Sequence, residues 1–115
     1  MLEVKPNISF EDLSKIDIRI GEILKVKDIE DSDKLVELTV DFGEFKRNII
    51  VGMKKERDNP NEIEGLQALF VVNLEPKEIR GHMSEGMLFD IGYADGITPV
   101  LAVPEKSVPN GVKAG

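Results

Sequence analysis

Strict alternation of apolar and polar residues between positions 36 and 42 constrains the fold of this chain more than any other feature. Apolar side chains stand at positions 36, 38, 40 and 42, and Glu37, Thr39 and Asp41 stand between them. Successive side chains of a strand point to opposite faces, so this segment predicts a strand with one buried and one solvated face. The segment is the clearest sign that the chain is built from strands.

Further strands are predicted on both sides of this segment. With the boundaries that turn residues suggest, the five strands cover residues 17–29, 35–42, 45–51, 66–74 and 86–91. In the first of them Gly21 interrupts the alternation of Ile18 and Ile20, which predicts a bulge or strong bend at the glycine. A long bent strand can contribute to two sides of a small barrel. We therefore predict an all-β fold, a five-stranded Greek-key barrel.

Short helical turns and a C-terminal extension complete this prediction. Ser9 offers an N-cap oxygen for a helical turn from Phe10 to Lys15, in which Phe10 and Leu13 can face inward. A second helical turn is predicted across the barrel end, from Asn61 to Glu64. Residues 97–103 form one more apolar strand after the barrel is complete.

Composition limits the classes of protein that fit. A chain of 115 residues with 41% hydrophobic content has room for a single domain, which we place over residues 1–115. The absence of Cys excludes disulfides and thiolate metal sites. No run approaches the length of a membrane span and no secretory signal is recognised, so we expect a cytoplasmic protein.

Catalytic and metal-binding motifs are also missing from the sequence. It contains neither H-E-x-x-H nor the P-loop pattern, and its single histidine, His82, is expected to be an exposed loop residue. The acidic segment 28–34 lacks the glycine and the final glutamate of an EF-hand, which favours a solvated turn over a calcium site. We therefore expect no enzymatic activity, no metal and no cofactor.

The charge balance argues against extensive contact with a phosphate backbone. Fifteen Lys and Arg residues against 22 Asp and Glu residues give a net charge of -7. The region from Glu44 to Arg57 is an exception, because it carries five cations against two anions. Its charges are either a gathered basic face or an ordinary solvated loop.

The loop from Asn73 to Met87 carries the most specific pattern. Its sequence fits N-L-x-P-K-x-x-R-G-x-x-S-x-G-M, and the chain also contains D-x-D-K-L at residues 31–35. Both patterns resemble the signature of the small tRNA-binding OB-fold domain, which occurs free-standing, as the export-related chaperone CsaA, and attached to methionyl-tRNA synthetases. The resemblance implies an OB-fold, whose loops between strands one and two and between strands four and five bind oligonucleotides.

The resemblance also implies a set of RNA-binding residues. Lys34, Lys77 and Arg80 are assigned to phosphates. Asn73 and Ser84 are assigned either to hydrogen bonds with sugar or base, or to bracing the loop, and Met87 to an unstacked base. Further contacts are assigned to four cations of the basic region: Lys46, Arg47, Lys54 and Lys55.

Two functions follow from the resemblance. In the first, the chain binds structured tRNA, alone or as the tRNA-binding subunit of a methionyl-tRNA synthetase; in the second, it binds unfolded polypeptide as a CsaA-like chaperone. Glu75 and Glu78 stand where the family usually has lysine, which weakens the basic character of the loop. The resemblance further implies a homodimer, which we expect to form through residues 97–115.

Overall fold

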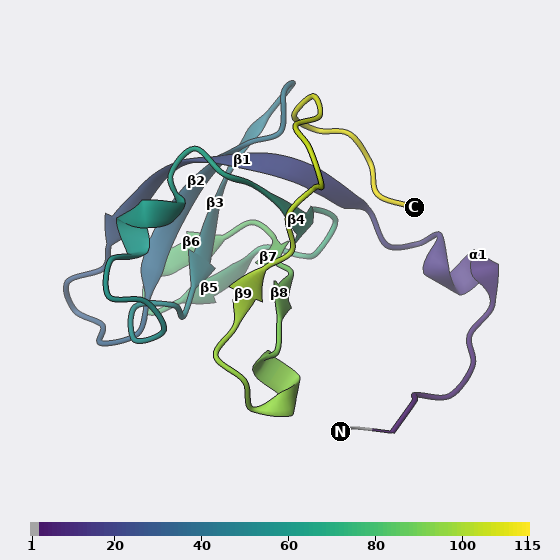
Figure 1. The fold of residues 1–115 in the computed structure, drawn as a ribbon, viewed down its shortest axis with the longest axis horizontal. Helices are drawn as coiled ribbons and strands as arrows, with labels where there is room; N and C mark the ends of the chain where they lie inside the picture. The colour runs from purple at the N-terminus through teal and green to yellow at the C-terminus, as the bar shows by residue number, and fades with distance from the viewer. Residues whose placement is uncertain (1–2) are drawn as a thin grey trace.

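The structure is a nearly closed antiparallel barrel, in which the strands follow the order β3-β2-β1-β4-β7 (Figure 1). It is a computed structural model that describes residues 3–115. In this part of the chain the elements are α1 (Phe10–Leu13), β1 (Ile18–Asp28), β2 (Val36–Asp41), β3 (Lys46–Val51), η1 (Pro60–Ile63), β4 (Gln67–Val71), β5 (Lys77–Ile79), β6 (His82–Ser84), β7 (Met87–Leu88), β8 (Asp90–Ile91), η2 (Tyr93–Asp95) and β9 (Val100–Leu101).

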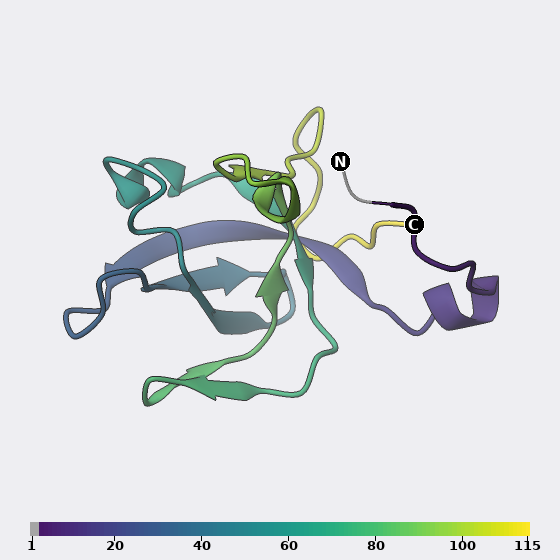
Figure 2. The same ribbon diagram turned by 90° about the horizontal axis from the view of Figure 1, so that it is seen from below.

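The long strand β1 links the two sides of the barrel, as predicted. Its first half, residues 18–22, pairs with β4, and its second half, residues 22–28, pairs with β2 (Figure 2). The irregularity in register falls between Ile23 and Lys25, so the predicted bulge at Gly21 is wrong in its position. Gly21 serves close packing instead, because a Cβ atom there would lie 2.7 Å from Cε1 of Phe42.

The barrel interior is a continuous apolar cluster to which every barrel strand contributes. Phe42 and Phe70 meet edge to face with their ring centroids 5.5 Å apart. Ile63 of η1 is fully buried in the same cluster, so this turn covers one end of the barrel, as predicted. The alternating residues of β2 point as expected, with Val36, Leu38 and Val40 buried.

The barrel closes along a seam between β3 and residues 84–85 at the end of β6. Side chains make most of its hydrogen bonds: Ser84 Oγ accepts from Ile50 N at 3.0 Å, and Glu85 Oε1 accepts from Asn48 N at 3.1 Å. Glu85 N donates to the carbonyl of Asn48 at 2.9 Å. Arg47 completes the seam by donating from Nη1 to the Glu85 carbonyl at 3.0 Å. We call these contacts the barrel seam.

The predicted strand boundaries are confirmed within a few residues, except at the last strand. The predicted strand over residues 86–91 divides into β7, which stays in the barrel, and β8, which leaves it to pair with β9. The loop before it contains a hairpin, β5–β6, that the sequence did not predict. His82 lies in this hairpin and is half-buried, so its placement in an exposed loop was wrong.

The first helical turn forms where it was expected but faces the wrong way. Ser9 caps α1 by accepting a hydrogen bond from Asp12 N at 3.0 Å, as predicted. Phe10 and Leu13 are nevertheless exposed rather than buried against the barrel, by 89% and 49%. Figure 1 shows α1 standing clear of the barrel at the end of an extended N-terminal segment.

The C-terminal tail returns to its own barrel. Gly111 N donates to the carbonyl of Ile20, and Ile20 N donates to the carbonyl of Val112. These bonds cover the edge of β1 that β2 leaves unpaired. The tail between Val108 and Asn110 is held by Gln67, whose Nε2 donates to Asn110 Oδ1 at 2.8 Å.

We predict that Ser84→Ala destabilises the fold by about 1–3 kcal/mol, because the buried N–H of Ile50 loses its acceptor at the barrel seam. Urea unfolding measures the change. Ser107→Ala is the control, since Ser107 is exposed, and it should change stability by less than about 0.5 kcal/mol. Equal stability of the two variants would contradict this role of Ser84.

Candidate nucleic-acid interface

The β5–β6 hairpin projects from the barrel in the loop between β4 and β7 (Figure 2). Lys77 and Ser84 face each other at its base, and Arg80 and Gly81 form its two-residue turn. Their φ angles of 50° and 82° are those of a type I′ turn. Arg80 is the single non-glycine residue between positions 3 and 115 with a positive φ. Strain of this kind, held at an exposed tip, indicates a functional residue.

The side chain of Arg80 joins the hairpin to the loop between β1 and β2, residues 29–35. Its Nη1 lies 3.5 Å from the carbonyl oxygen of Asp31, at the long end of hydrogen-bond range. Lys34 is exposed in the same loop. The two loops on which OB-folds bind oligonucleotides therefore meet at one end of the barrel, and both views of the ribbon agree on this placement (Figures 1 and 2).

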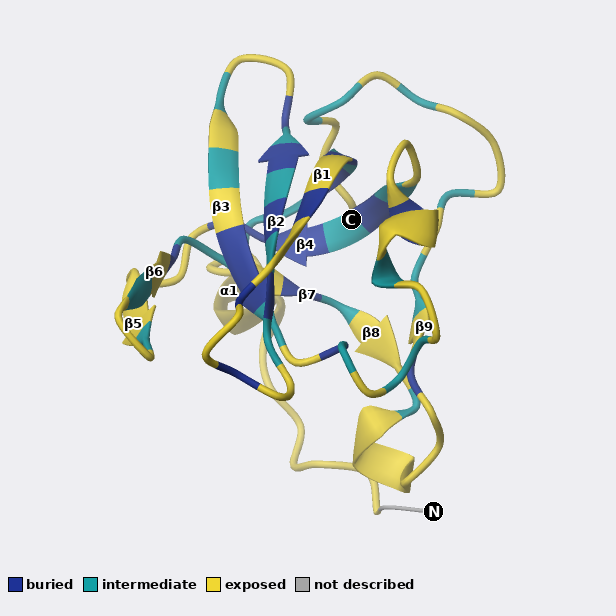
Figure 3. Ribbon diagram, turned by 90° about the vertical axis from the view of Figure 1, so that its left-hand side faces the viewer, coloured by how far each residue is buried: buried dark blue, intermediate teal, exposed yellow. Residues whose placement is uncertain are grey.

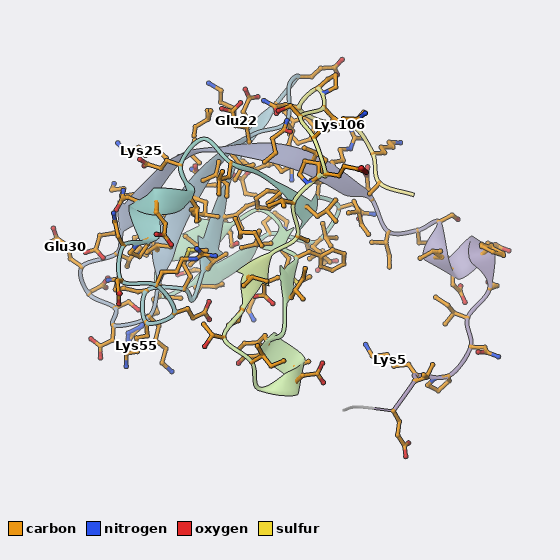
Figure 4. All side chains as sticks on the ribbon, in the orientation of Figure 1. Lys5, Glu22, Lys25, Glu30, Lys55 and Lys106 are labelled. Atoms are coloured by element: carbon orange, nitrogen blue, oxygen red, sulfur yellow. The ribbon has the colours of Figure 1, made fainter. Side chains whose placement is uncertain are left out.

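Five of the predicted cations are exposed. Lys34, Lys77 and Arg80 lie on the two loops that meet. Lys55 lies at the same end of the barrel as Glu30 of the β1–β2 loop (Figure 4). Lys46 begins β3, so a strand about 20 Å long separates it from the segment that carries Lys55. The structure thus gathers four of these cations at one end and leaves Lys46 at the other.

The other two predicted cations are used inside the fold. Arg47 donates to the carbonyls of Val72 and Glu85, and its guanidinium lies 4.8 Å from the centre of the Phe45 ring. Lys54 is half-buried, and its ammonium donates to backbone carbonyls of the β1–β2 loop. Their hydrogen-bonding groups face protein acceptors rather than solvent.

Asn73 and Ser84 are likewise braces, the second of the two roles considered for them. Asn73 Oδ1 accepts from Asp17 N at 2.8 Å, and its Nδ2 donates to the carbonyl of Lys15 at 2.6 Å. Asn73 therefore holds the segment before β1 rather than its own loop. Ser84 is buried in the barrel seam and also donates to the carbonyl of Gly86 at 3.2 Å.

Met87 lines a groove of about 930 Å³ beside the hairpin. The apolar wall of the groove is formed by Leu74, Ile79, Met87, Phe89 and Tyr93. Of its charged lining residues, Lys77 is basic and three are acidic: Glu75, Asp90 and Asp95.

Tyr93 is the residue of this groove that the sequence could have revealed. It is the one tyrosine of the chain, stands between Gly92 and Gly96, and is 73% exposed in η2. An aromatic ring in a glycine-rich turn is a signal for binding, and the sequence analysis did not use it. Figure 3 shows that the segment from β8 to β9, which includes η2, lies largely exposed outside the buried barrel, like the hairpin.

Several acidic groups near these loops are held by protein partners. Asp28 Oδ1 lies 2.5 Å from the Lys54 ammonium, and Glu85 belongs to the barrel seam.

At the opposite end of β1, hydrogen bonds from Arg19 hold the pKa of Asp17 below its usual value. Burial raises the pKa of Glu56, and the nearby charge of Asp90 adds to the rise.

Residues 3–115 offer neither a metal site nor a membrane-spanning helix. This part of the chain has no group of three His, Cys, Asp or Glu residues able to hold a metal ion. It also has no helix long and apolar enough to cross a membrane. The loops around Arg80 therefore remain the strongest candidate site.

The chain is a binding domain of the OB-fold class. It has the barrel of that fold, and the two loops on which such barrels bind ligands adjoin each other. Residues 18–113 match the family model described as "Putative tRNA binding domain". The chain belongs to this tRNA-binding domain family.

Similar proteins agree with this assignment. The chain is 41% identical over 106 residues to a methionine--tRNA ligase of Pyrococcus horikoshii, in a match that covers 92% of this chain but 14% of the ligase. The structure of a MetRS related protein from Pyrococcus horikoshii, 32% identical, has a TM-score of 0.88 and covers 96% of this chain and 100% of that one. The chaperone CsaA from Bacillus anthracis, 31% identical, has a TM-score of 0.82 with the same coverage.

We predict that Arg80→Asn leaves the stability unchanged or raises it by up to about 1 kcal/mol. Asn tolerates the positive φ, and Asn-Gly is the favoured sequence of a type I′ turn. Thermal unfolding of the variant and the wild type measures the difference. A clearly lower melting temperature for Arg80→Asn would show that the arginine stabilises the fold.

Proposed function

We propose that the domain binds tRNA without catalysing a reaction, through the β5–β6 hairpin and the β1–β2 loop. The observation that carries this proposal is Arg80, an exposed arginine in a strained turn at the point where the two loops meet. Lys34, Lys77 and Arg80 bind phosphates in this arrangement. Arg80 can grip one phosphate with two parallel hydrogen bonds.

The remaining predicted residues take secondary roles. Lys55 and Lys46 extend the phosphate contacts along the barrel, and the groove beside the hairpin accepts an unstacked base against Met87 and Tyr93. Arg47, Lys54 and Ser84 support this surface by hydrogen bonds inside the fold, whereas Asn73 holds the segment before β1. With few cations on this surface and a net charge of -7, we expect modest affinity that falls as salt is added.

We further propose that the domain serves a methionyl-tRNA synthetase, either within one chain or as a separate subunit. The chain spans 14% of the length of the methionine--tRNA ligase it matches, so the catalytic part of that relative lies outside the match. A tRNA-binding unit beside a catalytic unit raises the effective concentration of tRNA at the catalytic site. This role implies a cytoplasmic location.

A homodimer through residues 97–115 is also part of the proposal, with residues 97–103 as its most exposed apolar part, since residues 111–114 hydrogen-bond to β1 of their own chain. Ile97, Val100 and Val103 are each more than half exposed, which favours a covered surface over a free one. The N-terminal arm (residues 3–16) extends this surface, since a groove of about 700 Å³ lies between α1 and residues 113–115. A protruding Phe10 beside an apolar groove is self-complementary, as a two-fold interface requires.

We predict that the wild type binds bulk tRNA and that Arg80→Asn weakens binding by roughly 1–3 kcal/mol while remaining as stable. Filter binding across a salt series measures both the affinity and its salt slope, which should fall by about one unit in the variant. Lys25→Asn removes an exposed charge on β1, away from the hairpin, and is the matched control (Figure 4). If the wild type did not bind tRNA at low salt, the proposal would be wrong. If it bound unfolded polypeptide instead, the result would favour a CsaA-like role.

We predict that Phe10→Ser converts the dimer to a monomer, because the arm loses its largest apolar side chain. Light scattering at micromolar concentration should give twice the 12.8 kDa chain mass for the wild type and the single mass for the variant. Leu24→Ser, at an exposed apolar position on β1, should stay dimeric. A wild-type mass near 12.8 kDa would overturn the homodimer.

A further inference from the structure

The β1–β2 loop must hold a defined shape, because it carries Lys34 and the Asp31 carbonyl that meets Arg80. Ser32 at the centre of the loop is buried. Its hydroxyl accepts hydrogen bonds from the backbone N–H groups of Lys34 at 3.2 Å and Leu35 at 3.1 Å. These contacts close the end of the loop near β2, and the backbone N–H of Ser32 donates to the carbonyl of Ile29 at 3.1 Å near its start. All three bonds lie within the loop, so none of them ties it to the rest of the barrel.

Lys54 ties the loop to the segment after β3. Its Nζ lies 2.9 Å from the carbonyl oxygen of Ile29, 2.6 Å from that of Ser32 and 2.5 Å from Oδ1 of Asp28. The backbone N–H of Lys54 donates to the carbonyl of Lys34 at 3.0 Å. One residue therefore contacts the loop from its start to its end. We call this set of contacts the Lys54 clamp.

The clamp uses the whole hydrogen-bonding capacity of the ammonium group. An ammonium has three N–H donors, and three protein oxygens surround this one. The side chain is 23% exposed, in contrast with the exposed Lys55 next to it. A phosphate could reach Lys54 only by displacing a loop carbonyl or Asp28.

We propose that Lys54 is a positioning residue for RNA binding, which fixes the β1–β2 loop against the hairpin without touching the RNA. This inference rests on the proposed function. The clamp sets where Lys34 presents its ammonium and where the Asp31 carbonyl meets Arg80. Without the clamp the loop samples other shapes, and apparent affinity falls in proportion to the fraction of molecules that keep the competent shape.

Two substitutions separate positioning from direct contact. Lys54→Met removes the charge and the donors, whereas Lys54→Arg keeps the charge but replaces the ammonium with a planar guanidinium that cannot aim three N–H groups from one nitrogen. Lys55→Met is the matched control for loss of a neighbouring charge. Each full-length variant is titrated with bulk tRNA across a salt series, after urea unfolding has confirmed that it is folded. Amide hydrogen exchange of residues 28–35 is measured without tRNA.

Positioning predicts that Lys54→Met and Lys54→Arg both lose about ten-fold in affinity with an unchanged salt slope, and that loop amides exchange faster in both. A phosphate ligand would give a different result: Lys54→Arg would keep the wild-type affinity, and the salt slope of Lys54→Met would be about one unit lower. That result would overturn the inference. Unchanged exchange of the loop in both variants would overturn it as well. Lack of tRNA binding by the wild type is a distinct result, which would overturn the proposed function itself.

Discussion

Closure of the barrel at one seam is the constraint on which the other features depend. Between β3 and the end of β6, Ser84 and Glu85 supply side-chain oxygens where a regular ladder would use backbone carbonyls. The buried N–H of Ile50 would otherwise have no partner at a closed barrel edge. Because the same two residues end the β5–β6 hairpin, closing the barrel also fixes where the hairpin leaves it.

The cations of the chain divide between holding the fold and facing solvent. Arg19, Arg47 and Lys54 bind protein oxygens, whereas the cations on the hairpin and at Lys34 are exposed. This division reconciles an acidic chain with the proposed RNA ligand, since phosphate binding depends on the cations that are exposed on one surface and not on net charge alone.

Regular patterns in the sequence predicted the barrel. The features that they did not predict depend on short local elements or on contacts between segments that are distant in the sequence. Alternation of apolar and polar residues predicted β2 correctly, whereas the glycine in β1 did not mark the bulge. The hairpin was missed because its strands are three residues long and its turn is Arg-Gly rather than Asn-Gly. Capping by Ser9 is a local signal and was read correctly, but the exposure of Phe10 depends on tertiary structure. The density of cations around Lys54 predicted a role in RNA binding. Its actual partners lie 22 to 26 residues away in the sequence, so the residues next to Lys54 could not have revealed them.

The central claim is that tRNA contacts the hairpin and the β1–β2 loop as one surface. Amide hydrogen exchange with and without bulk tRNA tests it directly, because it reports on every segment of the folded protein in one experiment. We expect tRNA to slow exchange in residues 28–35 and 74–84 together and to leave the N-terminal arm unchanged. Protection confined to the arm and to residues 90–103, with both loops exchanging at their free rates, would contradict the account.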